Sequence, residues 1–370
     1  MNFTCSRKDL VEAFNVVSKA VSSKPQMPIL SGIYMKAEGS TLELQANNFE
    51  MGIITKIPVN TETPGEIVVT GKYLQEIVRK LSGETVNIEH DEAHHVANIK
   101  SDTANFKLLS MSSEDFPKVK SPETFSTFSI RTSTLKNLIR KTAYACASEE
   151  VRPIFTGCCL ELAGNTVSMI ATNTHRLAIM KDTLEAELEN LTFVVPSKTL
   201  WELFKMLDAS DPSNTVTVDC SRKNISFTFD NIFMTSRLID GQFPPYDKVI
   251  PKTSETVVTV KVAELMETVD RIALISKETE YNTIRFIFTQ DGINISSDSP
   301  EVGRAEEQIS AKIEGADIDI SFNVKYIVDV LKVIDSEECV IKLSKPLSPI
   351  DIREKDRDDF IYVVTPVRTS

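Results

Sequence analysis

Three of the four histidines in this chain lie close together among acidic side chains, in the segment Glu89-His90-Asp91-Glu92-Ala93-His94-His95. Imidazole and carboxylate groups bind divalent metals and transfer protons. However, their spacing does not match a zinc-site pattern, and the segment lies between two stretches with the alternation of β-strands. We interpret it as an exposed hairpin tip. A metal-dependent enzyme that uses this cluster is one alternative.

No other segment has the spacing of a catalytic motif. The sequence contains no nucleophile elbow, P-loop or dinucleotide-binding fingerprint. Its six cysteines include no CxxC pair, so we expect small, buried, reduced side chains. The adjacent Cys158 and Cys159 should point to opposite faces of a strand. These patterns predict no catalytic residues, no metal and no cofactor.

One helix pattern occurs three times. Leu74, Ile77, Val78 and Leu81 have the i, i+3, i+4, i+7 spacing of a buried helix face. The pattern returns 126 residues later at 200–207 and a further 127 residues later at 327–334. A second helix pattern, around Leu10, Leu135 and Leu265, keeps the same step. A period of this length indicates a repeated domain rather than a small solenoid unit.

Each repeat combines its two helices with runs that alternate apolar and polar residues, such as 41–46, 167–171 and 293–296. Proline-rich segments at 116–119 and 243–251 suit linkers. We predict an α+β fold of three tandem domains, 1–124, 125–252 and 253–370, each with two helices and about eight short strands.

The net charge of −12 is unevenly distributed. The six predicted helices together carry +9, which leaves −21 on the strands and loops. The chain has no apolar run of 18 residues and no signal peptide, so we expect a cytoplasmic protein with no membrane partner. Similar domains joined head to tail can close into a ring, and a ring lined by basic helices suits duplex DNA held without base readout.

Five segments resemble one family, the bacterial sliding clamps, which are the beta subunits of DNA polymerase III. They are Met27-Pro28-Ile29-Leu30, Ala171-Thr172-Asn173-Thr174-His175-Arg176-Leu177-Ala178, Asp240-Gly241-Gln242-Phe243-Pro244, Phe322-Asn323-Val324-Lys325-Tyr326 and Tyr362-Val363-Val364-Thr365-Pro366-Val367-Arg368. Their order and spacing extend the resemblance along essentially the whole chain.

The resemblance implies the DNA clamp fold and a processivity factor that acts as a head-to-tail homodimer, a ring of six domains around double-stranded DNA. It implies that the chain is not an enzyme and that it associates with the nucleoid in the cytoplasm. The implied partners are DNA polymerase III subunits, the clamp loader complex, repair polymerases, ligase and mismatch-repair proteins. A repeat scaffold that binds peptides but no DNA is the second alternative.

The resemblance also assigns sites. The partner-peptide groove takes Phe155, Thr172, His175, Arg176, Leu177, Pro244, Val249, Asn323, Tyr326, Val363, Thr365, Pro366, Val367 and Arg368. Thr174 and Thr365 stand where clamps usually have glycine and often methionine, and residues 153–155 are less aromatic, so the peptide preference should be shifted.

Basic residues on helices and one loop are the implied DNA contacts: Lys24, Lys72, Arg79, Lys80, Lys136, Arg140, Lys141 and Lys198. Such residues are ordinarily a solvated helix face. The implied dimer interface contains Phe106 and Leu108 on an edge strand and Leu274 and Ile275 at a helix end. From their types alone, these four would be core residues.

Overall fold

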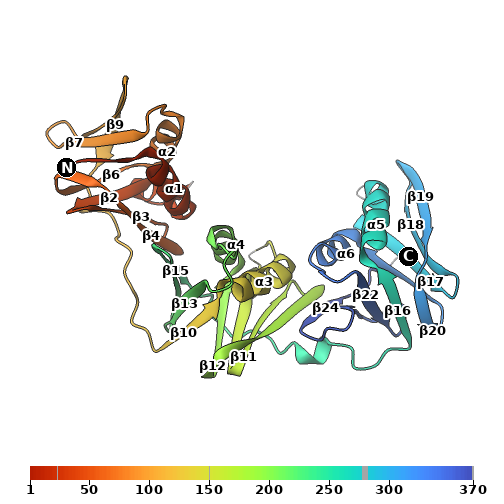
Figure 1. Ribbon diagram of the computed structural model, residues 1–370. Helices are drawn as coiled ribbons and strands as arrows, with labels where there is room; N and C mark the ends of the chain where they lie inside the picture. The colour runs from red at the N-terminus through yellow and green to blue at the C-terminus, as the bar shows by residue number, and fades with distance from the viewer. Residues whose placement is uncertain (23, 150, 277–281, 369–370) are drawn as a thin grey trace. The chain divides into compact units, whose positions relative to one another are not determined.

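The structure is a computed structural model that describes residues 1–22, 24–149, 151–276 and 282–368 (Figure 1). Its contacts group the chain into two compact units. Unit 1 comprises Met1–Thr132 and Lys205–Leu238, and unit 2 comprises Ser133–Phe204 and Ile239–Ser370. The middle third of the chain therefore contributes elements to both units.

The described residues form six α-helices, in three pairs along the chain. These are α1 (Arg7–Val17), α2 (Gly71–Lys80), α3 (Thr132–Thr142), α4 (Ser197–Met206), α5 (Val262–Ser276) and α6 (Val324–Leu331). Both predicted helix patterns are confirmed, because Leu10, Leu74, Leu135, Leu200 and Leu265 are all buried.

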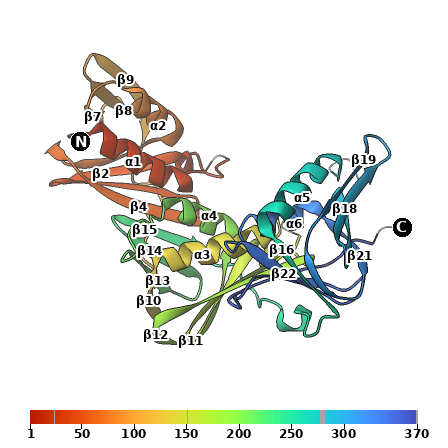
Figure 2. The same cartoon turned by 45° about the vertical axis from the view of Figure 1, so that its right-hand side comes forward.

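Each helix begins directly after a strand, where short polar side chains can cap it. The Ser6 hydroxyl accepts a hydrogen bond from the Asp9 amide at 3.4 Å at the start of α1, and the Asn323 side chain caps α6 through the Lys325 amide at 2.9 Å. Figures 1 and 2 show α1 beside α2, and α5 beside α6.

Unit 1 contains one antiparallel sheet of 13 described strands. Its order is β10-β13-β14-β15-β4-β3-β2-β6-β9-β8-β7-β1-β5. The strands are β1 (Asn2–Ser6), β2 (Gly32–Glu38), β3 (Thr41–Asn47), β4 (Met51–Pro58), β5 (Asn60–Thr63), β6 (Gly65–Thr70), β7 (Thr85–Asp91), β8 (Val96–Ser101), β9 (Ala104–Met111), β10 (Ser126–Arg131), β13 (Thr215–Cys220), β14 (Asn224–Phe229) and β15 (Ile232–Arg237). The pairing of β4 with β15 joins the first repeat to the second.

Unit 2 has two antiparallel sheets among its described residues, ordered β11-β12-β24-β23-β22-β16-β20 and β19-β18-β17-β21. Here β12 pairs with β24 and joins the second repeat to the third. The strands are β11 (Gly157–Thr172), β12 (Arg176–Pro196), β16 (Thr256–Lys261), β17 (Thr283–Thr289), β18 (Gly292–Ser299), β19 (Gly303–Ile309), β20 (Lys312–Gly315), β21 (Ile318–Asn323), β22 (Glu338–Leu343), β23 (Ile350–Glu354) and β24 (Phe360–Val364). Figure 2 shows α5 over β18 and β19.

The prediction of short strands fails in the middle repeat. There β11 and β12 span 16 and 21 residues, and they stay paired through register shifts around Gly164 instead of ending there. Cys158 and Cys159 are both fully buried in β11, and they contact different groups. Cys158 Sγ lies 3.5 Å from Cys146 Sγ, whereas Cys159 belongs to the apolar cluster around Phe243.

The described residues contain no helix long and apolar enough to cross a membrane.

Candidate functional site: a surface groove in unit 2

A cavity of about 290 Å³ opens on unit 2. It is bordered by the loop between β11 and β12, the linker after Phe243 and the end of β24. The lining residues are Phe155, Thr172, Thr174, His175, Arg176, Leu177, Pro244, Pro245, Tyr246, Val249, Pro349, Val363 and Thr365. We call this cavity the C-terminal groove.

The loop that borders the groove is fixed by its own side chains. The Thr172 hydroxyl accepts a hydrogen bond from the Thr174 amide at 3.1 Å. The Asn173 side chain accepts from the amides of His175 and Arg176, each at 3.1 Å. Thr174 has a φ of 78°, in the left-handed region that favours glycine. These hydrogen bonds hold a conformation that threonine rarely adopts.

Strand pairing places the apolar residues of the groove. Leu177 lies opposite Val363 in the register of β12 with β24, and both side chains are buried. The pairing continues into the loop, because the Thr365 amide donates to the His175 carbonyl at 2.9 Å. Phe155 packs edge-on to Phe243 with ring centroids 6.3 Å apart, beneath the linker. Such a groove can hold a few apolar anchors of an extended peptide.

Arg176 lies against the groove, but its charge is neutralised. The side chain is 4% exposed, and its guanidinium pairs with Asp329 of α6 at 2.6 Å and donates to the Tyr144 carbonyl. It also lies over the rings of Tyr326, at 4.7 Å, and Tyr144, at 5.4 Å. Arg176 therefore connects the groove loop to α6 rather than offering a free cation.

Five residues predicted for the partner-peptide groove are not in its lining: Asn323, Tyr326, Pro366, Val367 and Arg368. Tyr326 stacks on His175 with ring centroids 6.4 Å apart, and its hydroxyl accepts a hydrogen bond from Asn173 at 3.3 Å. Asn323 caps α6 instead of lining the cavity. Pro366, Val367 and Arg368 also lie outside the lining, and the Val367 amide donates to the Ser321 carbonyl at 2.8 Å.

Two linker residues and Pro349 line the groove but were not predicted. Pro245 and Tyr246 follow the predicted Pro244 directly, so the linker motif could have indicated them. The Tyr246 hydroxyl donates to Glu161 at 2.7 Å, and burial together with this carboxylate raises its pKa. No local pattern marks Pro349.

The basic residues predicted to contact DNA divide into two groups. Lys24, Lys72, Arg79, Lys80 and Lys198 are exposed. Lys136 and Arg140 are half-buried and engaged. The Lys136 ammonium lies 4.8 Å from the centre of the Phe204 ring, and Arg140 pairs with Asp335 at 2.5 Å.

The prediction that Lys141 contacts DNA is wrong. Its side chain has no exposed surface and forms an ion pair with the equally buried Glu354 of β23. Asp335 lies 3.1 Å from the same ammonium. Burial alone would raise the pKa of Asp335, but hydrogen bonds from Arg140 and Lys141 lower it. A cation enclosed in this way cannot reach a phosphate, so Lys141 is a structural residue.

The four residues predicted at the dimer interface are not core residues. Phe106 and Leu274 are 42% and 66% exposed, and Leu108 and Ile275 are half-buried. Within the described chain, residues 104–109 of β9 pair only with β8, so the other edge of this segment is open. Leu109, which the sequence analysis missed, is 78% exposed on the same strand.

The histidine cluster forms the predicted hairpin tip, a turn between β7 and β8. His94 Nδ1 lies 2.8 Å from Asp91, and His90 Nε2 lies 3.1 Å from Ser110 Oγ. Across the described ranges, no group of three or more His, Cys, Asp or Glu side chains is arranged to hold a metal ion.

The fold and groove define a class: a threefold α+β repeat whose domains are joined by sheet pairing, with a surface groove between a loop, a linker and the C-terminal strand. Three family models match the chain: the DNA polymerase III beta subunit N-terminal domain over residues 1–120, its central domain over 129–245 and its C-terminal domain over 247–368. The chain therefore belongs to the family of DNA polymerase III beta subunits, the bacterial sliding clamps, and has the three-domain clamp fold.

Known relatives match over their full length. The beta sliding clamp of Bacillus subtilis is 34% identical, with both chains covered completely. The crystal structure of the Bacillus subtilis sliding clamp has a TM-score of 0.95 at full coverage of both chains and the same 34% identity. A Pseudomonas aeruginosa sliding clamp, solved bound to griselimycin, has a TM-score of 0.93 and 30% identity, again with both chains covered completely.

Proposed function

We propose that this chain is a processivity factor. Two copies would close head to tail into a ring of six domains that encircles duplex DNA and reads no sequence. The observation that carries the proposal is the full-length agreement with sliding clamps in both sequence and fold. The proposed domains are 1–124, 125–252 and 253–370. The family models break between 120 and 129 and between 245 and 247, so the proposed boundary at 252 lies inside the match to the C-terminal domain.

The clamp would catalyse no reaction and need no cofactor. Its C-terminal groove would receive short linear peptides from DNA polymerase III subunits, the clamp loader, repair polymerases, ligase and mismatch-repair proteins. The buried Leu177 and Val363 and the half-exposed Val249 suit apolar anchors. The Thr365 hydroxyl donates to the His175 carbonyl at 3.0 Å, so we expect a smaller and more polar floor there than a methionine would give.

The DNA contacts would be diffuse and made by exposed cations on helices. Lys72, Arg79 and Lys80 of α2 are the best candidates, because all three are exposed and two lie in the last turn. Phosphate contacts of this kind depend on salt and give no sequence preference. Persistence on DNA would then come from topology rather than from affinity.

The test loads the protein onto nicked circular DNA with a clamp loader and measures retention by gel filtration. We expect retention on the intact circle and release after a restriction enzyme cuts it. Retention on the cut, open-ended DNA would refute encirclement. If the protein bound polymerase peptides but never remained on circles, the peptide scaffold without DNA binding would be the better description.

A charge-reversal variant then tests the contacts. Lys72→Glu with Arg79→Glu and Lys80→Glu should reduce loading at least tenfold and leave peptide binding unchanged. The matched control reverses three exposed lysines outside the helices, Lys181, Lys252 and Lys345, with the same change in net charge. Equal losses in both variants would show that only net charge matters.

A further inference from the structure

Unit 1 repeats the loop of the C-terminal groove. Between β3 and β4, the Asn47 side chain accepts a hydrogen bond from the Phe49 amide at 2.8 Å, as Thr172 does from Thr174. The Asn48 side chain accepts from the amides of Glu50 and Met51 at 3.1 and 2.8 Å, as the Asn173 side chain does from those of His175 and Arg176.

The backbone of the two loops agrees as well. Phe49 has a φ of 69°, close to the 78° of Thr174. Such an angle is uncommon for residues other than glycine, asparagine and aspartate. The shared conformation therefore indicates one loop design that the chain uses twice, 125 residues apart.

The strand beside the loop is also repeated. Gly52 lies opposite Thr235 in the pairing of β4 with β15, as Leu177 lies opposite Val363 in the pairing of β12 with β24. The Arg237 amide donates to the Glu50 carbonyl at 2.8 Å, the counterpart of the bond from Thr365 to His175.

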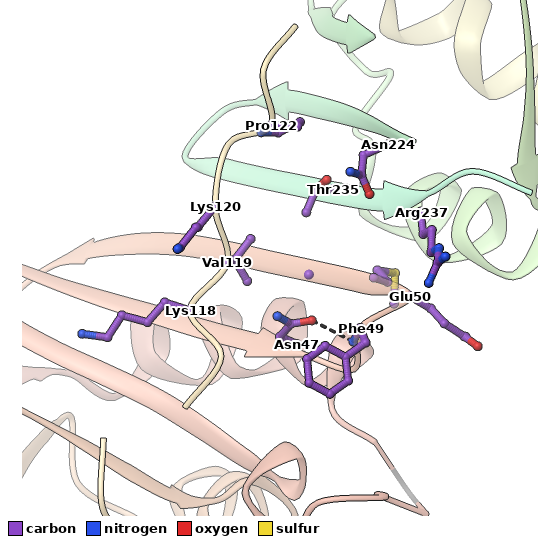
Figure 3. A pocket seen from close by; sticks show the side chains of 12 residues that line it. Asn47, Phe49, Glu50, Lys118, Val119, Lys120, Pro122, Asn224, Thr235 and Arg237 are labelled. Carbon is purple, nitrogen blue, oxygen red and sulfur yellow. Dashed lines mark hydrogen bonds between the residues drawn. The ribbon is translucent and has the colours of Figure 1, made fainter. Parts of the chain in front are cut away.

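A cavity of about 160 Å³ lies at this position, here called the N-terminal groove (Figure 3). Seven residues of its lining correspond in register to residues that line the C-terminal groove: Asn47, Phe49, Glu50, Met51, Gly52, Thr235 and Arg237. The linker after Phe116 contributes Lys118, Val119, Lys120 and Pro122 to this lining, as the linker after Phe243 contributes Pro244, Pro245, Tyr246 and Val249 to the other. The two cavities are thus the same structural site in two repeats.

The apolar anchor position of the N-terminal groove is filled by the chain itself. Gly52 replaces Leu177, and a Cβ at Gly52 would lie 2.8 Å from the Val119 side chain. Val119 is buried, and its amide donates to Gln45 at 2.9 Å. A partner peptide with only apolar side chains would therefore find no vacant anchor site here.

The rest of the lining is polar and carries positive charge. Thr235 replaces Val363, Arg237 replaces Thr365, and the linker adds Lys118 and Lys120. Lys118 pairs with Glu66 at 3.0 Å. In the described part of the chain, neither Lys120 nor Arg237 forms an ion pair, and Figure 3 shows Thr235 between them. Glu50 is the one carboxylate in this lining.

We propose that the N-terminal groove binds an extended, acidic segment of a partner protein. Carboxylates at alternate positions of an extended peptide project to one side, about 7 Å apart. They would pair with Lys120 and Arg237, while the Asn224 side-chain amide and the Thr235 hydroxyl would hydrogen-bond the peptide. The site does not depend on ring closure or DNA.

The test measures fluorescence anisotropy of a labelled hexapeptide of alternating glutamate and threonine with the full chain at about 0.1 M salt, where exposed charges beyond about 10 Å are screened. We expect saturable binding that weakens at least tenfold in Lys120→Glu/Arg237→Glu. The matched control, Lys332→Glu/Lys345→Glu, reverses two exposed lysines outside the groove and should bind nearly as well as the original protein.

Further variants separate loss of the proposed site from a folding defect and from binding at the C-terminal groove. Asn224→Asp adds one carboxylate with little change of shape and should weaken binding about threefold, so a folding defect of the double variant would not end the test. Leu177→Ala/Val363→Ala should retain binding, since it alters only the C-terminal groove. Equal affinity of the original protein and Lys120→Glu/Arg237→Glu, or equal binding of a lysine–threonine hexapeptide, would overturn the proposal. The proposal would also be overturned if short duplex DNA bound at the N-terminal groove and the labelled hexapeptide did not.

Discussion

Replacing Lys141 by methionine tests the buried ion pair that joins α3 to β23. The Lys141 ammonium and the Glu354 carboxylate are both 0% exposed. Removing one member of such a pair leaves an uncompensated charge and typically costs about 3–5 kcal/mol. Glu354 would keep a hydrogen bond from the Asp335 amide at 2.8 Å, and Arg357 lies 3.4 Å from its other oxygen. We therefore expect Lys141→Met to lower the free energy of unfolding by an amount at the lower end of this range, about 3 kcal/mol.

The assay is urea unfolding followed by far-ultraviolet circular dichroism, with the shift in midpoint converted to free energy. Lys141→Met/Glu354→Met should be less destabilised than Lys141→Met, because replacing both partners of a buried pair by apolar side chains is often neutral or stabilising. Lys80→Met, which removes an exposed lysine, should stay within about 0.5 kcal/mol of the original protein.

The same variants separate stability from DNA binding. At a temperature where Lys141→Met is folded, its retention on circular DNA should match that of the original protein. If Lys141→Met unfolded at the same urea concentration as the original protein and lost DNA retention, the lysine would reach DNA. The reasoning from burial would then be wrong.

Three further outcomes are expected. Deleting residues 366–370 leaves the bonds of Thr365 to His175 but removes that of Val367 to Ser321. Polymerase-peptide binding should be lost, because the chain just after the groove is no longer held, and the elution volume should not change. A monomer would mean that the tail is structural. Leu274→Lys with Ile275→Lys should give soluble monomers in light scattering, because charges at a buried seam are costly, and a persistent dimer would refute that assignment. A hydrogen bond from Tyr34, helped by Lys118, holds the pKa of Glu66 below its ordinary value of 4.5. Its stabilisation is therefore present above that value and lost as the pH falls through the lower folded pKa, so Glu66→Gln should be less stable than the original protein near pH 7, with a deficit that shrinks on acidification below the folded pKa. A deficit that stayed constant as the pH was lowered would contradict this.

Local patterns in the sequence predicted the helices well, because a helix buries one stripe whose period can be counted along the chain. Strand length in the middle repeat was not predictable in this way. Residues 185–190 of β12 alternate as Glu-Ala-Glu-Leu-Glu-Asn, but they are mostly exposed, so the alternation marks no buried face. The strand continues through this segment because its pairing with β11 resumes beyond the register shifts around Gly164. Cross-strand partners decide such segments, and these partners are distant in sequence.

The same limit explains the error at Lys141. Its neighbours Arg140 and Lys136 make the helix look like a basic face, and only the fold brings Glu354, 213 residues away, against it. For the C-terminal groove, family resemblance indicated the loop, the linker and the last strand. It did not show that Arg176 is neutralised by Asp329, a contact across 153 residues.

In the two grooves, the residues that build the loop are alike, whereas the residues that would contact a ligand differ. Residues that build the loop are alike in both copies: a short polar side chain at 47 and 172, and asparagine at 48 and 173. Residues that face a ligand differ in charge or size, as Arg237 differs from Thr365. If the N-terminal groove bound nothing, the residues that face it could be of any type. The packing of Val119 against Gly52, which fills the anchor position, would then have no role in binding. We infer that the N-terminal groove shares the loop backbone of the C-terminal groove, has its apolar anchor position closed by Val119 and offers a site for a more polar partner.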